Sequence, residues 1–174
     1  MENFLVVVDM QNDFIQGALG TKEALAILDN VVEKINSFQG TIFATYDTHF
    51  ENYVETSEGK KLPIPHCIKG TEGWQLNKRV QKALEKKGYI KVEKSAFGSV
   101  ELPMLIKKEA RGQDFQVLLI GLCTDICVVS NALILKAHFP DEEISVASDC
   151  CAGVNPETHK SALEIMKCCQ INIL

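Results

Sequence analysis

The chain has 174 residues, of which 46% are hydrophobic and 24% are charged. This length and apolar content suffice for a sizeable core, and we expect one domain over residues 1–174. Its 18 basic and 23 acidic residues give a formal net charge of −5, so no basic surface for nucleic acid is evident and nucleic acid is not an expected partner.

The first predicted element is the apolar run Phe4–Val8, which reads as a buried parallel strand. Its five residues are too few for a signal peptide or a membrane span, and the cysteine count of seven is odd, so we expect a cytoplasmic chain with reduced thiols and no membrane partner.

The apolar run Phe4–Val8 is followed by Asp9, a carboxylate that is unfavourable for packing in an apolar strand. Asp9 is therefore a candidate general base. The alternative is a turn or cap residue, because the turn formers Asn12 and Asp13 follow.

A helix is predicted over Glu23–Phe38, where apolar residues recur at three-and-four spacing. The last helix has a start signal in Asn155 and Pro156, a cap and a first-turn proline. Helical patterns separate most of the apolar runs that suit buried strands, which are Phe4–Val8, Thr41–Tyr46, Tyr89–Val92, Phe115–Ile120, Ile144–Ala147 and Ile171–Leu174. This alternation predicts an α/β fold of three layers, with helices on both faces of a mainly parallel six-stranded sheet.

The second strand ends in Asp47, Thr48 and His49, and the period of a strand places the carboxylate and the imidazole on the same side. Glu58 and His66 follow in a long turn-rich segment, and a loop of that size is usually functional. One carboxylate and two histidines, with a second carboxylate as a further candidate, are suitable ligands for zinc, manganese or iron. The alternative for His49 alone is a surface or cleft histidine.

The other two histidines, His138 and His159, lie in helical patterns, and we interpret both as structural.

Lys94 closes the strand-like run Tyr89–Lys94, just before Ser95. A lysine at the carboxyl end of a strand can support an active site. The alternative is an ordinary solvated face, because this region is rich in lysine.

The segment Gly121–Val129, GLCTDICVV, follows the strand Phe115–Ile120 and opens an apolar-periodic helix. Cys127 therefore lies in the first turn of a helix, where unpaired N–H groups and the helix dipole favour a thiolate. The alternative is a small buried hydrophobic residue. Asp9, Lys94 and Cys127 follow three different strands, and open parallel sheets bind ligands at that edge. An acid, a cation and a thiol converging there make a coherent nucleophile set.

These motifs resemble the isochorismatase-like cysteine hydrolase superfamily over essentially the whole chain. The matching segments are VDMQNDF (Val8–Phe14), KVEKSAF (Lys91–Phe97) and GLCTDICV (Gly121–Val128). The resemblance implies a Rossmann-like fold and an Asp9, Lys94, Cys127 triad in which the second cysteine of the motif is the nucleophile. It also implies a cis peptide just before Cys123 and an oxyanion hole made by the backbone N–H groups of Cys123 and Cys127.

Within that superfamily the chain looks like the nicotinamidase branch, which implies that Asp47, His49 and His66 bind a divalent ion beside the triad. Zinc is the expected metal, with manganese and iron as alternatives. Glu58 is the best-spaced fourth ligand and Glu55 a weaker one. Three aromatic residues are candidates for walls of the substrate pocket or for ordinary core packing: Phe14, Phe97 and Trp74.

The resemblance implies hydrolysis of nicotinamide to nicotinic acid and ammonia through a cysteine thioester, in NAD salvage, by a homo-oligomer that is a dimer or a tetramer. One alternative is a related cysteine amidohydrolase acting on another small amide or ureide. A third reading is a non-catalytic metal-binding or thiol redox protein that uses Cys123 and Cys127 as an exchangeable pair. A structural zinc site is not expected, because no two-residue-spaced pair of pairs exists among the seven cysteines. These are Cys67, Cys123, Cys127, Cys150, Cys151, Cys168 and Cys169.

Overall fold

A parallel sheet forms the centre of the molecule, as a computed structural model describing all residues 1–174 shows. Its strand order is β3-β2-β1-β4-β5-β6, and every neighbouring pair is parallel. The strands are β1 (Glu2–Val8), β2 (Thr41–Asp47), β3 (Ile90–Lys94), β4 (Phe115–Leu122), β5 (Glu143–Ala152) and β6 (Asn172–Ile173). The predicted fold class is thus confirmed, and the sheet is parallel throughout.

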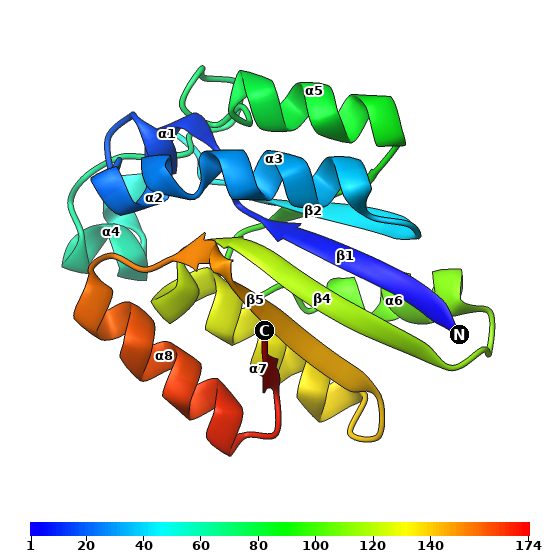
Figure 1. Cartoon of the computed structure of the whole chain (residues 1–174). Helices are drawn as coiled ribbons and strands as arrows, with labels where there is room; N and C mark the ends of the chain where they lie inside the picture. Colours follow the sequence, from blue (N-terminus) through cyan, green and yellow to red (C-terminus); the bar gives the residue numbers. More distant parts are fainter.

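Helices cover both faces of this sheet (Figure 1). On one face lie α1 (Asn12–Ile15), α2 (Lys22–Ala26), α3 (Leu28–Ser37) and α5 (Lys78–Lys87). On the other lie α6 (Leu102–Ala110), α7 (Val129–His138) and α8 (Pro156–Cys168). The short helices η1 (Tyr53–Glu55) and α4 (Ser57–Lys61) interrupt the turn-rich segment after β2, and the π-helical turn η2 (Thr124–Val128) leads from β4 into α7.

The central strand β1 is apolar on both sides because both faces of the sheet are covered. Leu5 and Val7 join the core under α3, whereas Phe4, Val6 and Val8 join the core under α6 and α7. A strand that is buried on both faces has a continuous run of apolar residues, as β1 has over Phe4–Val8.

The predicted helix over Glu23–Phe38 is divided in the structure. Ile27 ends α2 and precedes the first residue of α3, and its ψ of −7° interrupts the helical backbone. The apolar stripe continues across the break, because Ala24, Leu28 and Val31 all enter the same core. The spacing of apolar residues therefore could not reveal the division.

The longest helix, α8, has 13 residues. A bilayer crossing takes about 20 apolar residues, and no helix here combines that length with that character.

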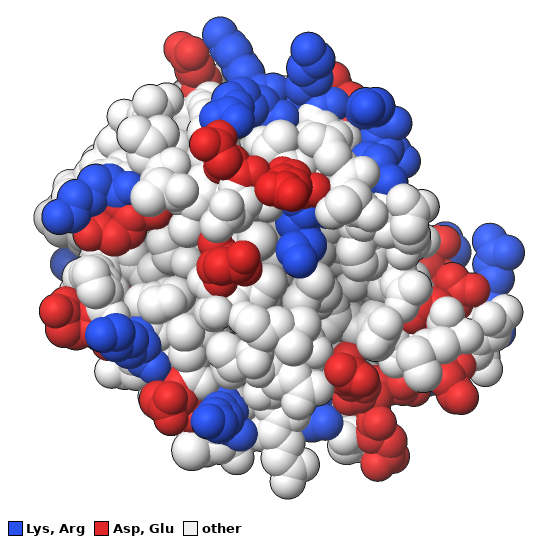
Figure 2. All heavy atoms as spheres, in the orientation of Figure 1, with Lys and Arg blue, Asp and Glu red and all other residues white.

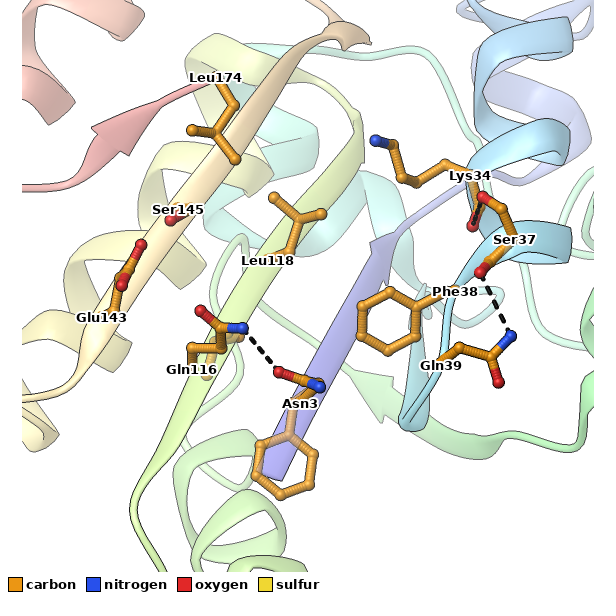
Figure 3. A pocket seen from close by; sticks show the side chains of 12 residues that line it. Asn3, Lys34, Ser37, Phe38, Gln39, Gln116, Leu118, Glu143, Ser145 and Leu174 are labelled. Atoms are coloured by element: carbon orange, nitrogen blue, oxygen red, sulfur yellow. Dashed lines mark hydrogen bonds between the residues drawn. The ribbon is translucent and has the colours of Figure 1, made fainter. Parts of the chain in front are cut away.

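One cavity lies away from the carboxyl ends of the strands. It has a volume of about 360 Å³ and is lined by residues near the amino ends of three strands, Asn3, Gln116 and Glu143, with Lys34 of α3 on its side (Figure 3). The Gln116 side-chain amide donates to Asn3 Oδ1 at 2.6 Å. None of the candidate catalytic or metal-binding residues lines this cavity.

Lysine and arginine side chains gather over α5 at the top of the face in Figure 2, with acidic groups beside them. Elsewhere on this face positive and negative groups are interspersed among uncharged atoms. This face therefore carries no continuous basic surface.

Candidate active site

Three strands deliver an acid, a cation and a thiol to one place. Asp9 directly follows β1, Lys94 is the last residue of β3, and Cys127 lies in η2 after β4. Lys94 Nζ is 2.7 Å from Asp9 Oδ2 and 3.6 Å from Cys127 Sγ. All three residues are buried, with at most 5% of each exposed.

The two oxygens of Asp9 have different partners. Oδ1 accepts a hydrogen bond of 2.6 Å from the Thr45 hydroxyl. Oδ2 has the Lys94 ammonium 2.7 Å away as its one polar partner, so it is the oxygen that we assign to take a proton. Burial raises the pKa of Asp9, because the charged form loses its water.

Lys94 is held as an ammonium by several negative neighbours. Burial opposes its charge, but Asp9, Cys127 and Asp47 together raise the pKa of Lys94 above its usual range. The same ammonium lies 3.4 Å from Asp47 Oδ1 and donates to the Ala96 carbonyl at 3.1 Å. Because Lys94 is shared between two carboxylates, it offsets the burial of Asp9 only in part, and the pKa of Asp9 stays raised.

The thiol of Cys127 differs from the sequence expectation. Its position predicted a helix N-terminus that favours thiolate, but burial and the neighbouring Asp9 raise the pKa of Cys127 well above its ordinary value. Cys127 is also the fourth residue of the turn η2, ahead of α7 rather than in its first turn. The resting group is therefore a protonated thiol, which needs a base before it can attack.

The backbone before the nucleophile presents a free donor. The Leu122–Cys123 peptide bond is cis. The Cys123 carbonyl accepts from the N–H groups of Ile126 and Val128, whereas the Cys123 N–H donates to no group of the chain. Gly121 has a φ of +117°, and a Cβ there would lie 2.2 Å from the Val8 carbonyl oxygen. Only glycine lets the end of β4 pass so close to β1.

A second cluster lies beside the triad. Asp47, His49, Glu58 and His66 place one ligand atom each within 4.8 Å of one another. His49 Nε2 lies 3.0 Å from Asp47 Oδ2 and 3.7 Å from Glu58 Oε1, and His66 Nε2 lies 3.6 and 3.5 Å from the same two oxygens. Glu55 does not belong to this cluster.

The donor set fits a divalent ion. His66 Nδ1 is 2.9 Å from the Ile64 carbonyl and donates to it in the neutral ring, which leaves the lone pair of Nε2 directed at the cluster. Burial opposes protonation of His66, but Asp47 and Glu58 raise its pKa to about 10, so the cluster attracts positive charge. Burial opposes ionisation of Asp47 too, yet its contacts with both histidines and with Lys94 hold its pKa below the usual range. Zinc, manganese and iron accept such a mixed set of imidazole and carboxylate ligands.

The three candidate pocket aromatics have different surroundings. Phe97 is exposed and lines a cavity of about 350 Å³ together with His49, Glu58 and Lys61. The ring of Phe14 is buried, with its centroid 5.5 Å from that of His66.

Trp74 packs in the core, outside that cavity. Its ring lies 5.5 Å from that of Tyr46 and 4.0 Å from the Lys91 ammonium, and its N–H donates to the Thr48 hydroxyl.

Three buried or partly buried polar residues position the site, although the sequence did not predict a role for them in it. Gln11 donates to the Asp47 carbonyl and accepts from the Asp47 N–H, both at 2.8 Å, so it holds the end of β2. Asp13, a turn former in the sequence, accepts from the Cys67 N–H and fixes the residue after His66. Asn131 donates to the Cys127 carbonyl at 2.8 Å. Their one local signal is their place in the sequence, because Gln11 and Asp13 lie within VDMQNDF and Asn131 follows the motif that contains Cys127.

Together, the fold and these groups define a cysteine hydrolase with a cluster suited to a divalent metal. Comparison with known proteins agrees. The isochorismatase domain model matches residues 3–173, and the chain therefore belongs to the isochorismatase domain family.

The relatives of the chain include proteins named as nicotinamidases and pyrazinamidases. The nicotinamidase/pyrazinamidase of Mycobacterium tuberculosis is 29% identical to this chain, over 98% of this chain and 97% of that protein. The structure of the Pyrococcus horikoshii pyrazinamidase in complex with zinc is 30% identical, with a TM-score of 0.80 over 100% of this chain and 99% of that one. The Bacillus subtilis nicotinamidase/pyrazinamidase PncA is 28% identical, with a TM-score of 0.85 and 99% of both chains covered.

Proposed function

We propose that this chain is a nicotinamidase, which hydrolyses nicotinamide to nicotinic acid and ammonia and so feeds NAD salvage. The observation that carries the proposal is the contact of the nucleophile set with the metal-type cluster, where Lys94 joins Asp9 and Cys127 to Asp47. The relatives named above support the choice of a pyridine or pyrazine carboxamide as the substrate.

The reaction begins with a proton transfer within the triad. Asp9 Oδ2 takes the proton of the Cys127 thiol, and Sγ attacks the carboxamide carbon, so that the carbonyl oxygen becomes an oxyanion. The backbone N–H groups of Cys123 and Cys127 are the proposed donors to this oxyanion, and each such donor contributes about 10²- to 10³-fold to the rate.

The second half of the reaction returns the proton and releases the acid. Asp9 gives its proton to the departing nitrogen, the C–N bond breaks, and ammonia leaves a thioester on Cys127. A water that loses a proton to Asp9 then attacks the thioester, the C–S bond breaks, and the thiol is restored as nicotinic acid leaves. Lys94 stays an ammonium throughout and stabilises the thiolate while it exists.

Asp47, His49, Glu58 and His66 are the proposed ligands of the metal, with zinc as the proposed ion. When bound, a divalent ion there supplies a Lewis acid to which the ring nitrogen of the substrate can bind. The chain's own contribution is the fixed position of this cluster beside the triad, which lets one substrate reach both. Phe97, on the wall of the adjoining cavity, is proposed to contact the ring.

Ammonia release from nicotinamide tests the proposal directly. The purified chain is assayed before chelation, after chelation, and after zinc, manganese or iron is restored. We expect activity that chelation removes and metal restores. No release with any of the three metals would contradict nicotinamide as the substrate and favour another small amide or ureide. The dimeric or tetrameric state is proposed from the family resemblance, and the cytoplasmic location is proposed from the odd cysteine count and the short first apolar run.

A matched pair of glutamates tests the metal ligands. Glu58→Gln removes a carboxylate whose oxygen lies within 3.7 Å of both histidines, whereas Glu55→Gln changes an exposed residue three positions earlier. We expect Glu58→Gln to weaken zinc binding, measured by calorimetry on the folded protein, by about 10-fold or more, and Glu55→Gln to leave it unchanged. Equal zinc affinity in the two variants would remove Glu58 from the ligand set.

A further inference from the structure

The turn that carries the nucleophile is braced by a segment outside the triad and the metal cluster. Thr124, the first residue of η2, is fully buried, and its hydroxyl lies 2.8 Å from His159 Nδ1 on α8. Asp125, the next residue, accepts from the Val154 N–H with both carboxylate oxygens at 3.2 Å. Two consecutive residues of the turn are therefore held by the stretch 154–159.

The contacts from residues 154–159 hold a part of the backbone that the proposed reaction needs. Thr124 directly follows Cys123, whose N–H has no acceptor within the chain. The backbone of Cys123 thus links this donor to the residue that His159 holds. A shift of Thr124 that moved the Cys123 backbone with it would displace that N–H from the developing oxyanion. A misplacement of about 1 Å at a reacting centre is enough to cost on the order of 10²-fold in rate.

The base of the His159 side chain is closely packed. A Cβ on Gly153 would lie 2.9 Å from the His159 Cβ, so the end of β5 packs directly against the base of this side chain. Burial lowers the pKa of His159 despite the nearby charge of Asp125, so the ring is neutral at neutral pH and shares a single hydrogen bond with the Thr124 hydroxyl. Nothing in the reaction derived above uses His159, and its helical position had suggested a structural role only.

We propose that His159 is a positioning residue for the reaction, which holds Thr124 and thereby keeps the Cys123 N–H aligned with the substrate's carbonyl oxygen. The proposal rests on the proposed cysteine hydrolase mechanism, and it adds a residue 32 positions beyond the nucleophile to that machinery.

Three substitutions separate positioning from a merely structural role. His159→Leu removes the hydrogen bond, His159→Asn keeps a polar atom near the position of Nδ1, and Thr124→Val removes the hydroxyl at constant volume. His138→Leu is the matched control, because His138 is exposed at the end of α7. We expect kcat to fall by roughly 10-fold or more in His159→Leu and Thr124→Val with KM within about 2-fold, and His159→Asn to recover most of the loss.

A double variant tests the coupling of the two residues. If the hydrogen bond is the cause, His159→Leu combined with Thr124→Val is no slower than the worse single variant. Circular dichroism and a thermal melt check that each variant is folded. Additive losses, a rise in KM at unchanged kcat, or no recovery by His159→Asn would each overturn the proposal.

A substrate-independent readout keeps this test separate from the identity of the substrate. Acylation of Cys127 by p-nitrophenyl acetate needs the oxyanion donors, whereas alkylation by iodoacetamide does not. We expect His159→Leu to slow acylation by about 10-fold while alkylation stays within about 2-fold. If the unsubstituted chain is acylated yet releases no ammonia from nicotinamide, the proposed function fails. The ratio of the acylation rate to the alkylation rate then still decides the role of His159. Equal slowing of both reactions would overturn it.

Discussion

The ammonium of Lys94 lies 3.4 Å from Oδ1 of Asp47, and this contact joins two otherwise separate groups of polar residues. One group contains the nucleophile, and the other is suited to hold a metal. Both side chains are buried, so solvent screens the attraction between their charges only weakly. The charge of Lys94 therefore acts on the general base and on the metal-type cluster at once.

Removal of the Lys94 charge should cost stability as well as activity. Lys94→Met leaves Asp9 and Asp47 buried without their cation, and breaking a buried ion pair in this way costs about 3–5 kcal/mol. Urea unfolding measures the effect, and adding Asp9→Asn to Lys94→Met should recover part of the loss. An unfolding free energy equal to that of the unsubstituted chain would contradict the reading of Lys94 as the shared partner.

The two cysteines of the nucleophile turn should behave differently. Cys127→Ala removes the attacking sulfur and should lower kcat by at least about 10³-fold. Cys123→Ala keeps the backbone N–H, so most of the activity should remain. Steady-state kinetics on both variants measure this difference. A loss of similar size in Cys123→Ala would favour the thiol-pair reading instead.

Activity should fall in acid at a pH set by Asp9. The reaction needs its carboxylate, and burial raises its pKa above the ordinary value of 3.8. The carboxylate is present above the raised pKa and is lost as the pH falls through it, so kcat/KM should decline at a pH above that of an exposed aspartate. A pH profile of kcat/KM on protein shown to be folded at each pH is the measurement. Full activity down to pH 4 would contradict the role of Asp9.

Asn131 should stabilise the site through three hydrogen bonds. Its amide donates to the carbonyls of Cys127 and Phe97, and its oxygen accepts from the Ser99 N–H. Asn131→Leu leaves these groups unsatisfied, at about 1–3 kcal/mol each where they are buried, and should also lower kcat. Asn30→Leu is the control, because Asn30 is exposed and has one such bond. Chemical unfolding of the two variants compares the costs, and equal costs would contradict this prediction.

The parts of the fold that follow a short-range pattern were predictable from the sequence. Phe4–Val8 in β1 is a continuous apolar run and β2 is mainly apolar. Because the carboxyl ends of parallel strands meet at one edge of the sheet, the convergence of Asp9 with Lys94 could be expected. The spacing of Asp47 and His49 also placed both side chains together. The expected cis peptide before Cys123 is present.

The remaining features depend on contacts between distant parts of the chain. Gln11 is bonded to Asp47, 36 positions away, and Thr124 to His159, 35 positions away, and no local pattern encodes either pair. The protonation state of the Cys127 thiol differs from the sequence expectation for the same reason. Its place in the chain indicated the helix dipole, but the burial that raises its pKa comes from the packed site as a whole.

The central claim is that Cys127 forms a thioester with the acyl group of nicotinamide, and intact-protein mass spectrometry after an acid quench tests it most directly. We predict that the quenched enzyme carries one nicotinoyl group, that peptide mapping places it on Cys127, and that Cys127→Ala carries none. Turnover of nicotinamide by Cys127→Ala at an unchanged rate, with no adduct on either protein, would contradict the account.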